Sequence, residues 1–130
     1  MPRDDRQRSL NALVDMLVSS KIAVGYLEGV NPAEFAQGMQ IQDSVIRRIE
    51  IVGEAAKRVD EPLRPSLETM TALTWPQICG MRDLLIHQYD GVDLNIVYKT
   101  VKDYLPPLID CLDTYLKEHN HHPDQSNPSE

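Results

Sequence analysis

The sequence predicts an all-α protein, an up-and-down bundle of four to five helices. Three observations support this fold class. Apolar residues recur every three or four positions over three long segments, which is the period of a helix. Leu, Ile, Val and Ala dominate the apolar composition, and only 5% of the residues are aromatic. No window shows the alternation of apolar and polar residues that is typical of a strand.

The first long helix carries an apolar stripe and ends near Gly29. The stripe consists of Leu10, Leu13, Val14, Leu17, Val18, Val24 and Leu27. The next segment, Asn31-Pro32-Ala33-Glu34, places a capping residue before a proline and a glutamate three positions after the cap. This pattern predicts the start of a short helix that carries Phe35.

A third helix spans about residues 41–59. Its apolar stripe consists of Ile41, Val45, Ile49, Val52, Ala56 and Val59. Gly53 inside this helix costs about 1 kcal/mol relative to Ala, which predicts that another backbone passes close to it. Residues 60–73 contain two prolines and are expected to form a loop with room for one helical turn.

Two further helices complete the bundle. The capping sequence Thr74-Trp75-Pro76-Gln77 opens the first, and Asp90-Gly91 is expected to end it because Gly readily adopts the left-handed conformation. Asp93 caps the last helix. The core side of that helix holds Leu94, Val97, Val101, Leu105, Leu108, Leu112 and Leu116. Pro106-Pro107 should kink or split it, since proline lacks the donor for the carbonyl four residues back.

The length of 130 residues fits one domain. We expect residues 1–118 to form the bundle and residues 119–130, which are polar, to form a disordered tail. The chain lacks an apolar run of membrane-spanning length, and its charged N-terminus is unlike a signal peptide, so a cytoplasmic protein is expected. Cys79 and Cys111 have no metal-type spacing and are interpreted as reduced buried thiols.

The net charge of −7 excludes a protein that coats nucleic acid indiscriminately, because such binding neutralises phosphates with basic residues. Acidic residues outnumber basic ones most strongly after residue 83, so a local basic surface near Arg82 remains compatible with the sequence. Four basic residues in the third helix are expected to form a solvated face rather than an RNA track. They are Arg47, Arg48, Lys57 and Arg58.

The segment from Arg82 to Tyr89 carries the candidate chemistry. His87 is the only histidine outside the last twelve residues, and histidine has an ordinary pKa near neutral pH. On one helix, Asp83 would lie four residues before His87 and could accept its ring N–H. Arg82 and His87 would lie about 140° apart around the axis, so they converge only through the long arginine side chain or across an interface with another copy.

Several motifs in the right order resemble the HepT-like ribonuclease toxin family of the HEPN superfamily, over about residues 8–117. They are residues 49–56, 75–83, 87–89, 91–93 and 105–108. The resemblance implies a homodimer in which the arginine–histidine motifs of two subunits face one cleft. It also implies a metal-independent ribonuclease without a cofactor, the toxin of a toxin–antitoxin module.

The resemblance assigns a role to each residue of the motif. Arg82 and His87 map onto the catalytic pair, and Asp83 onto a supporting position. Tyr89 maps onto the tyrosine that receives AMP from ATP, transferred by a minimal nucleotidyltransferase antitoxin called MntA. Leu84 stands where many members carry a second basic residue, which implies weaker RNA binding or an altered substrate choice.

Less specific interpretations stay open. The chain could be a non-catalytic helical module that binds a nucleotide or a nucleotidyltransferase partner through the same motif. Arg82 could be an ordinary ion-pair partner of Glu54 or Asp83, and Tyr89 a packing residue. A metal site in the tail is a weaker alternative. It would use His119, His121 and His122.

Overall fold

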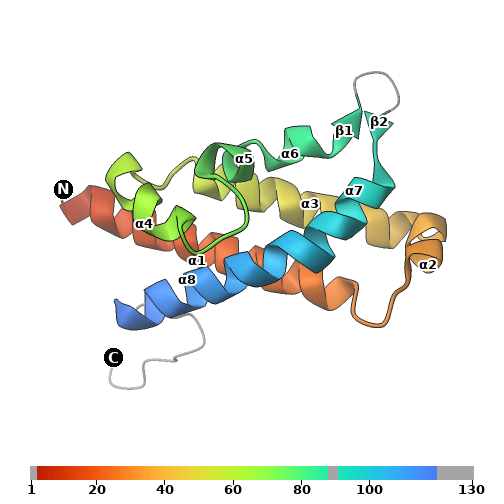
Figure 1. Cartoon of the computed structure of the whole chain (residues 1–130), viewed down its shortest axis with the longest axis horizontal. Coiled ribbons are helices and arrows are strands. Elements are labelled where there is room, and N and C mark those ends of the chain that lie inside the picture. Colours follow the sequence, from red (N-terminus) through yellow and green to blue (C-terminus); the bar gives the residue numbers. More distant parts are fainter. Residues whose placement is uncertain (1–2, 88–90, 120–130) are drawn as a thin grey trace.

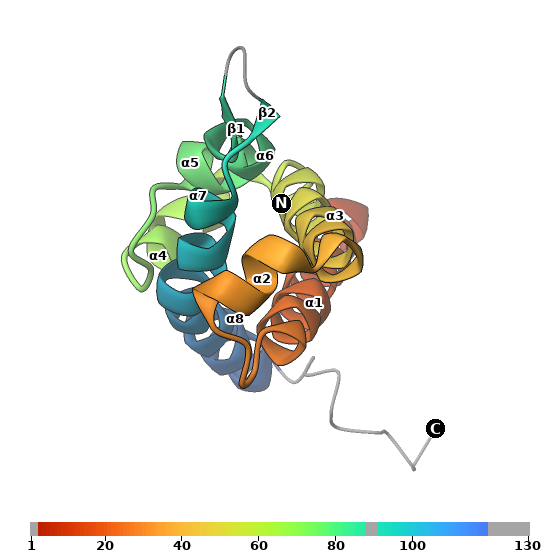
Figure 2. The same ribbon diagram turned by 90° about the vertical axis from the view of Figure 1, so that its right-hand side faces the viewer.

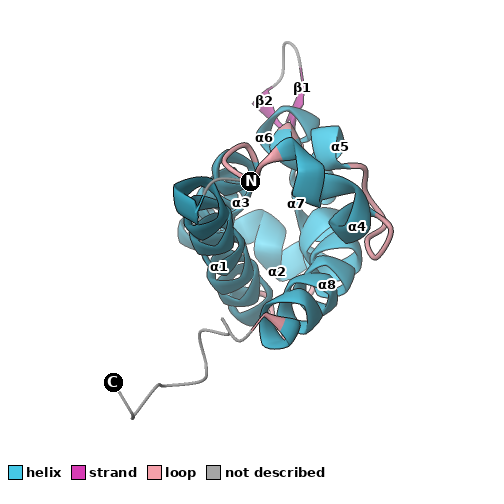
Figure 3. Cartoon of the chain, turned by 90° about the vertical axis from the view of Figure 1, so that its left-hand side faces the viewer, coloured by secondary structure: helices cyan, strands magenta, loops and turns pink. Residues whose placement is uncertain are grey.

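The computed structural model describes residues 3–87 and 91–119 and confirms the all-α bundle. The long helices are α1 (Arg3–Tyr26), α3 (Met39–Ala56) and α8 (Leu105–Glu118), and α1 packs against both of the others (Figure 1, Figure 2). The short helices are α2 (Pro32–Gln37), α4 (Arg64–Glu68), α5 (Trp75–Cys79), α6 (Met81–Leu84) and α7 (Leu94–Lys99). Strands β1 (Ile86–His87) and β2 (Gly91–Val92) form a small antiparallel pair at the edge of the bundle (Figure 3).

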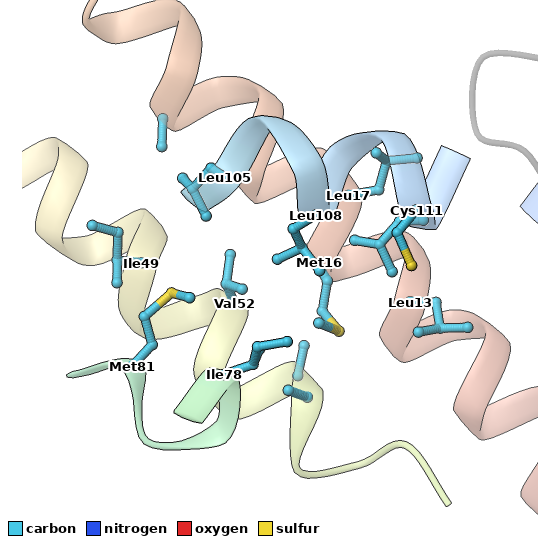
Figure 4. Close-up of a cluster of buried hydrophobic side chains, with 14 of the residues drawn as sticks. Leu13, Met16, Leu17, Ile49, Val52, Ile78, Met81, Leu105, Leu108 and Cys111 are labelled. Atoms are coloured by element: carbon cyan, nitrogen blue, oxygen red, sulfur yellow. The ribbon is translucent and has the colours of Figure 1, made fainter. Parts of the chain in front are cut away.

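The core fills the space between the long helices and the α5–α6 segment. Apolar side chains from α1, α3, α5, α6 and α8 converge there (Figure 4). They include Leu13, Met16, Leu17, Ile49, Val52, Ile78, Met81, Leu105 and Leu108, each at most 1% exposed. Burial of such a side chain stabilises the fold by about 1.5–3 kcal/mol, so the predicted stripes do form the packed faces.

The three predicted helix caps are confirmed. The Asn31 side chain accepts from the backbone N–H of Glu34, whose carboxylate accepts from the N–H of Asn31. Thr74 and Gln77 make the equivalent reciprocal pair at the start of α5. Asp93 Oδ1 accepts from the backbone N–H groups of Asn95 and Ile96 in the first turn of α7. Each cap satisfies donors that a helix leaves unpaired at its N-terminus.

The predicted loop at residues 60–73 contains a 3₁₀ turn (Glu61–Leu63) followed by α4. Leu67 of α4 is fully buried, and its carbonyl accepts a hydrogen bond from Cys111 Sγ at 3.3 Å. The Glu68 carboxylate accepts from the backbone N–H of Trp75. The loop is therefore fixed to α8 on one side and to α5 on the other.

The expected single helix up to Asp90-Gly91 is wrong. It breaks at Gly80 and ends at Leu84, and the chain is extended at β1. The carbonyl of Leu85 accepts the backbone N–H of Asp93 at 2.7 Å, because that N–H precedes α7 and needs a partner outside it. Leu85 therefore leaves the helix to meet the start of α7. Gly91 does adopt the left-handed conformation, with φ +79°, but within the strand pair.

The last helix is divided, as the prolines predict. A π-helical turn (Thr100–Tyr104) separates α7 from α8, and the N–H of Leu105 donates to the carbonyl of Thr100, five residues back. Pro106 has no N–H, so it could not continue an α-helical ladder at this point. Next to the turn, Lys102 Nζ donates to the carbonyl of Leu27 at 2.9 Å, which ties this segment to the end of α1.

The sequence also made predictions about the C-terminal tail and about membrane-spanning segments. His119 stacks on the Tyr115 ring with centroids 4.0 Å apart, and residues 120–130 of the predicted disordered tail, with His121 and His122, lie outside the described residues. In the described part of the chain, no helix is long and apolar enough to cross a membrane.

Candidate functional site

The α5–α6 segment carries Arg82 and is held firmly against α3. Trp75, Ile78 and Met81 recur every three residues and are all buried. Trp75 also donates from Nε1 to the carbonyl of Ala56 at 3.0 Å. A Cβ at Gly53 would lie 3.1 Å from the carbonyl oxygen of Cys79. The predicted close approach at Gly53 is thus confirmed, and it brings the start of α6 onto α3.

Arg82 lies at the surface where α6 meets α3. Its Nε is 3.2 Å from Glu50 Oε2, and the side chains are 64% and 27% exposed, respectively. The prediction of an ion pair was right in kind, but the partner is Glu50 rather than Glu54 or Asp83. Glu50 could have been found from its place three residues before Gly53, because that spacing puts both on one helix face. Solvent reaches the guanidinium, so a phosphate group could approach it.

His87 reaches the site through β1 rather than through a helix. Its backbone pairs with that of Gly91 in β2, and its side chain lies outside the described part of the structure. The expected alignment of Asp83 with His87 on one helix face is wrong, because α6 ends between them. Asp83 itself is exposed, and its backbone N–H donates to the carbonyl of Gly80 at 2.8 Å.

Tyr89 lies outside the described residues. The strands that flank residues 88–90 in the sequence are described, and they lie at the edge of the bundle (Figure 2). The strand pair joins the end of α6 to the start of α7. Arg82 and His87 are therefore separated by only residues 83–86, of which Asp83 is exposed and Leu85 is buried in the core.

The cysteines are unsuited to nucleophilic chemistry. Burial raises the pKa of the Cys111 thiol from 9.0 to about 11. Burial also raises the pKa of Cys79, although the positive charges of Arg64 and Lys57 act in the opposite direction. A thiol with a raised pKa is protonated at neutral pH and is a poor nucleophile. Both cysteines are free, as the sequence predicted, but only Cys111 is buried as expected, whereas Cys79 is partly exposed.

Two basic residues just beyond the end of α3 are paired with acidic neighbours. Lys57 Nζ lies 3.2 Å from Glu54 Oε1, and Arg58 Nη2 lies 2.8 Å from Asp15 Oδ2 of α1. Near the other end of α3, an open depression of about 310 Å³ was not predicted. It is lined by Tyr26, Asp43, Ser44, Arg47 and Arg48. Among the described residues, no group of three His, Cys, Asp or Glu side chains is placed to bind a metal ion.

The comparison with protein families is decisive. A family model described as "Ribonuclease HepT-like" matches residues 16–115, a span that includes Arg82, His87 and Tyr89. The chain belongs to this HepT-like family. The resemblance stated from the motifs is therefore confirmed.

Individual proteins are similar to this HepT-like chain. The putative RNase MJ1380 of Methanocaldococcus jannaschii is 31% identical over 96 residues, which cover 74% of the chain and 85% of that protein. The putative RNase MJ0125 of the same organism is 33% identical over 96 residues, which cover 74% of the chain and 80% of that protein. A protein of Thermococcus cleftensis named probable ribonuclease HepT is 37% identical over 75 residues, which cover 58% of the chain and 66% of that protein. No solved structure matches the chain.

Proposed function

We propose that this HepT-like protein is a metal-independent endoribonuclease and the cytoplasmic toxin of a HepT/MntA-type toxin–antitoxin module. The observation that carries the proposal is the exposed guanidinium of Arg82, which lies within the family match and five residues before His87. The names of the relatives support the same class of reaction. Arg82 and His87 are the proposed catalytic residues, with Asp83 in support.

The chemistry uses a nucleophile that RNA carries itself. His87 removes the proton of a 2′-OH, the 2′ oxygen attacks phosphorus, and the bond from phosphorus to the 5′ oxygen breaks. A second proton donor protonates the leaving 5′ oxygen, and the product is a 2′,3′-cyclic phosphate. Positioned acid–base catalysis of this kind contributes about 10²–10⁴-fold in rate. Arg82 holds the phosphate through its planar fork and offsets the developing charge.

A homodimer supplies what a single motif lacks. One imidazole cannot be the base and the acid at the same moment, whereas two motifs that face one cleft provide one of each. The position of Arg82 at the outer edge of α6, rather than in the core, is compatible with such a shared cleft.

Regulation is proposed to act at Tyr89. An MntA-like nucleotidyltransferase would transfer AMP from ATP: the phenol oxygen attacks the α-phosphorus, and pyrophosphate leaves. The resulting phosphodiester carries negative charge seven residues from Arg82. It would compete with RNA for that guanidinium.

One observation favours the alternative, a non-catalytic module that binds a nucleotide or a partner. Arg82 is already paired with Glu50, so the guanidinium is partly engaged. The Arg82 side chain is 64% exposed and that of Glu50 is 27% exposed, and an ion pair that solvent reaches contributes only about 0–1 kcal/mol. A phosphate could therefore displace the carboxylate at small cost, and the ribonuclease remains the better-supported function.

The decisive experiment is RNA cleavage in the presence of EDTA. The purified protein should cut labelled single-stranded RNA, and Arg82→Ala and His87→Ala should each lower the rate at least about 100-fold. Lys117→Ala on α8, a substitution at a distant exposed lysine, is the matched control and should leave the rate unchanged. Full activity in His87→Ala would contradict the proposal, and RNA binding without cleavage would favour the alternative.

The modification is tested separately. Incubation with ATP and a neighbouring nucleotidyltransferase should add AMP to the protein, detected by mass spectrometry. Tyr89→Phe should abolish the addition, whereas Tyr104→Phe should not. An unmodified Tyr89 in the parent protein would contradict this regulation.

A further inference from the structure

The open depression near the start of α3 lies between that helix and the end of α1. The two helices run side by side, and Tyr26 is the last residue of α1 (Figure 2, Figure 3). The depression has a volume of about 310 Å³, and none of its residues takes part in the chemistry proposed at Arg82 and His87. We call it the α3 depression. It is lined by Tyr26, Asp43, Ser44, Arg47 and Arg48.

Three polar side chains of α3 meet at this depression. Arg47 and Arg48 follow Ser44 by three and four residues, the spacings that make neighbours on the surface of a helix. A hydroxyl and two guanidinium groups are therefore within reach of one ligand group. Each guanidinium presents a fork of N–H donors and no acceptor, so that ligand group must be rich in acceptors.

These donors are unpaired within the described part of the chain. Arg47 and Arg48 form no ion pair or hydrogen bond there, and neither does the Ser44 hydroxyl. Asp43 is the one acidic residue of the lining, so two positive charges against one negative charge leave a local charge of +1. In a chain with a net charge of −7, such a local positive surface favours an anion from solution.

The shape of the depression and the Tyr26 ring indicate which anion binds. Guanidinium forks bind carboxylates as well as phosphates, so the charge alone does not decide. The depression is open, whereas sites for small molecules enclose most of the ligand, so it suits a strand that passes across it. Tyr26 is 41% exposed, and its ring contacts no other ring or cation among the described residues. A free aromatic face beside phosphate-binding arginines is typical of sites for single-stranded RNA, because any base can stack on it.

The α3 depression lies close to the Arg82 site along α3. Arg47 and Glu50 are three residues apart, so they are neighbours on the helix surface and about 4.5 Å apart along its axis. Glu50 Oε2 in turn lies 3.2 Å from Arg82 Nε. One RNA strand can therefore contact Arg82 and, a short way along its backbone, the α3 depression.

We infer that the α3 depression binds a nucleotide of the RNA substrate at a short distance from the cleaved bond. Arg47 and Arg48 hold its phosphate, the Ser44 hydroxyl donates a further hydrogen bond, and a base stacks on Tyr26. This inference rests on the proposed function and deepens it, because it adds a second binding site for the same strand. It revises the expectation that Arg47 and Arg48 form only a solvated face.

Two double variants that each remove two positive charges test the site. Arg47→Ala with Arg48→Ala should raise the dissociation constant of a labelled RNA of about ten nucleotides at least roughly tenfold. Lys57→Ala with Arg58→Ala, just beyond the end of α3, is the matched control and should change it less than about twofold, because salt screens charges at that distance. All proteins carry His87→Ala, which keeps the RNA intact.

Fluorescence anisotropy measures the binding, and circular dichroism verifies folding. The salt dependence of binding should also become shallower by about 0.7 for each phosphate contact that is lost. Unchanged binding in the Arg47–Arg48 double variant, or equal losses in the two double variants, would overturn the inference.

Tyr26 is tested by the kind of side chain rather than by charge. Tyr26→Leu removes the ring and should raise the dissociation constant at least about fivefold. Tyr26→Phe keeps a face for stacking and should bind RNA within about twofold of the parent. If Tyr26→Leu bound RNA like the parent, the depression would hold no base and the inference would be wrong.

The length of the RNA provides an independent test in proteins that retain His87. A dinucleotide reaches only the Arg82 site, so Arg47→Ala with Arg48→Ala should leave its cleavage unchanged. For the RNA of about ten nucleotides, the same double variant should raise KM and leave kcat unchanged. Contacts away from the reacting atoms bind the substrate and the transition state equally. Equal losses with both substrates would indicate a general effect of charge and overturn the inference.

An acidic segment of a protein partner is another group that two arginines bind. The double variant Arg47→Ala with Arg48→Ala distinguishes it from RNA. If this variant bound RNA like the parent but no longer bound the neighbouring nucleotidyltransferase, the depression would be a partner site and the inference would be wrong.

These results are separable from catalysis. If the Arg47–Arg48 double variant loses RNA binding but Arg82→Ala cuts RNA normally, the proposed function fails and the α3 depression stands as an RNA-binding site. If RNA cleavage depends on Arg82 but the double variant keeps the KM and the dissociation constant of the parent, the inference is wrong and the function stands.

Discussion

Gly53 allows the backbone of α5 to lie against α3. A side chain there would lie 3.1 Å from the carbonyl oxygen of Cys79 and 3.3 Å from that of Ile78. We expect Gly53→Ala to lower the free energy of unfolding by about 1–3 kcal/mol, because the steric cost exceeds the gain in helix propensity. Urea denaturation measures this change.

Gly25 in α1 is the matched control for that substitution. Among the described residues, nothing beyond the local helix backbone lies within 4 Å of a Cβ built there. Gly25→Ala should leave the protein equally stable or stabilise it by up to about 1 kcal/mol. If both variants behaved alike, packing at Gly53 would not restrict the side chain.

Cys111 should make stability depend on pH in alkaline solution. Its pKa is raised to about 11 in the folded protein, so the unfolded chain loses the thiol proton first as pH rises above 9. The contribution of the protonated thiol to the free energy of unfolding is fully present below pH 9. It is lost between pH 9 and 11, which lowers the free energy of unfolding by up to about 2–3 kcal/mol. The variant Cys111→Ser retains a donor for the Leu67 carbonyl. Its free energy of unfolding, measured by denaturation at a series of pH values, should depend less on pH than that of the parent protein. Parallel profiles would contradict this assignment.

Asn31 fixes the start of α2, which is only six residues long. Asn31→Ala should destabilise the protein by about 1 kcal/mol, whereas Asn31→Gly should cost only a few tenths. Thermal unfolding of the two variants measures the difference. Equal losses in both would show that the side-chain hydrogen bond to Glu34 contributes little.

The helices with strong local signals were predictable. Asn31, Thr74 and Asp93 each combine a capping side chain with a following apolar period, and local chemistry decides such boundaries. The end of α6 was not predictable. It depends on the hydrogen bond from Asp93 to the carbonyl of Leu85, a contact that no local pattern in the sequence encodes.

The candidate site was predictable in composition more than in geometry. The motif identified Arg82 and His87. The four-residue spacing of a helix placed Asp83 and His87 on one face, but this placement is wrong because His87 lies in β1. The partner Glu50 depends on how α3 is rotated about its axis, which the packing at Gly53 determines. Rotation of this kind follows from tertiary packing rather than from spacing.

The whole molecule has a net charge of −7, so RNA binding should be local. Suppose that the two Arg82 side chains of a dimer each contact one phosphate of the RNA. From these contacts alone, the logarithm of the binding constant for single-stranded RNA should then fall with the logarithm of the salt concentration with a slope of about −1.4, or about −0.7 for each phosphate. The inactive variant His87→Ala keeps the RNA intact during titration. Lys117→Ala should leave the slope unchanged, and a slope steeper than about −4 would indicate a broad basic surface instead.

The π-helical turn at Thr100–Tyr104 makes this segment tolerant of a change in length that α8 would not tolerate. The wide turn accommodates one residue more than an α-helical turn would, so loss of a single residue there would leave an ordinary α-helical turn and the same positions beyond it. Loss of one residue within α8, before Leu112, would instead rotate the rest of the helix by about 100°. Asp113 and Lys117 would then occupy the buried places of Leu112 and Leu116. Removal of one residue is therefore compatible with the bundle in the π-helical turn, but not in α8.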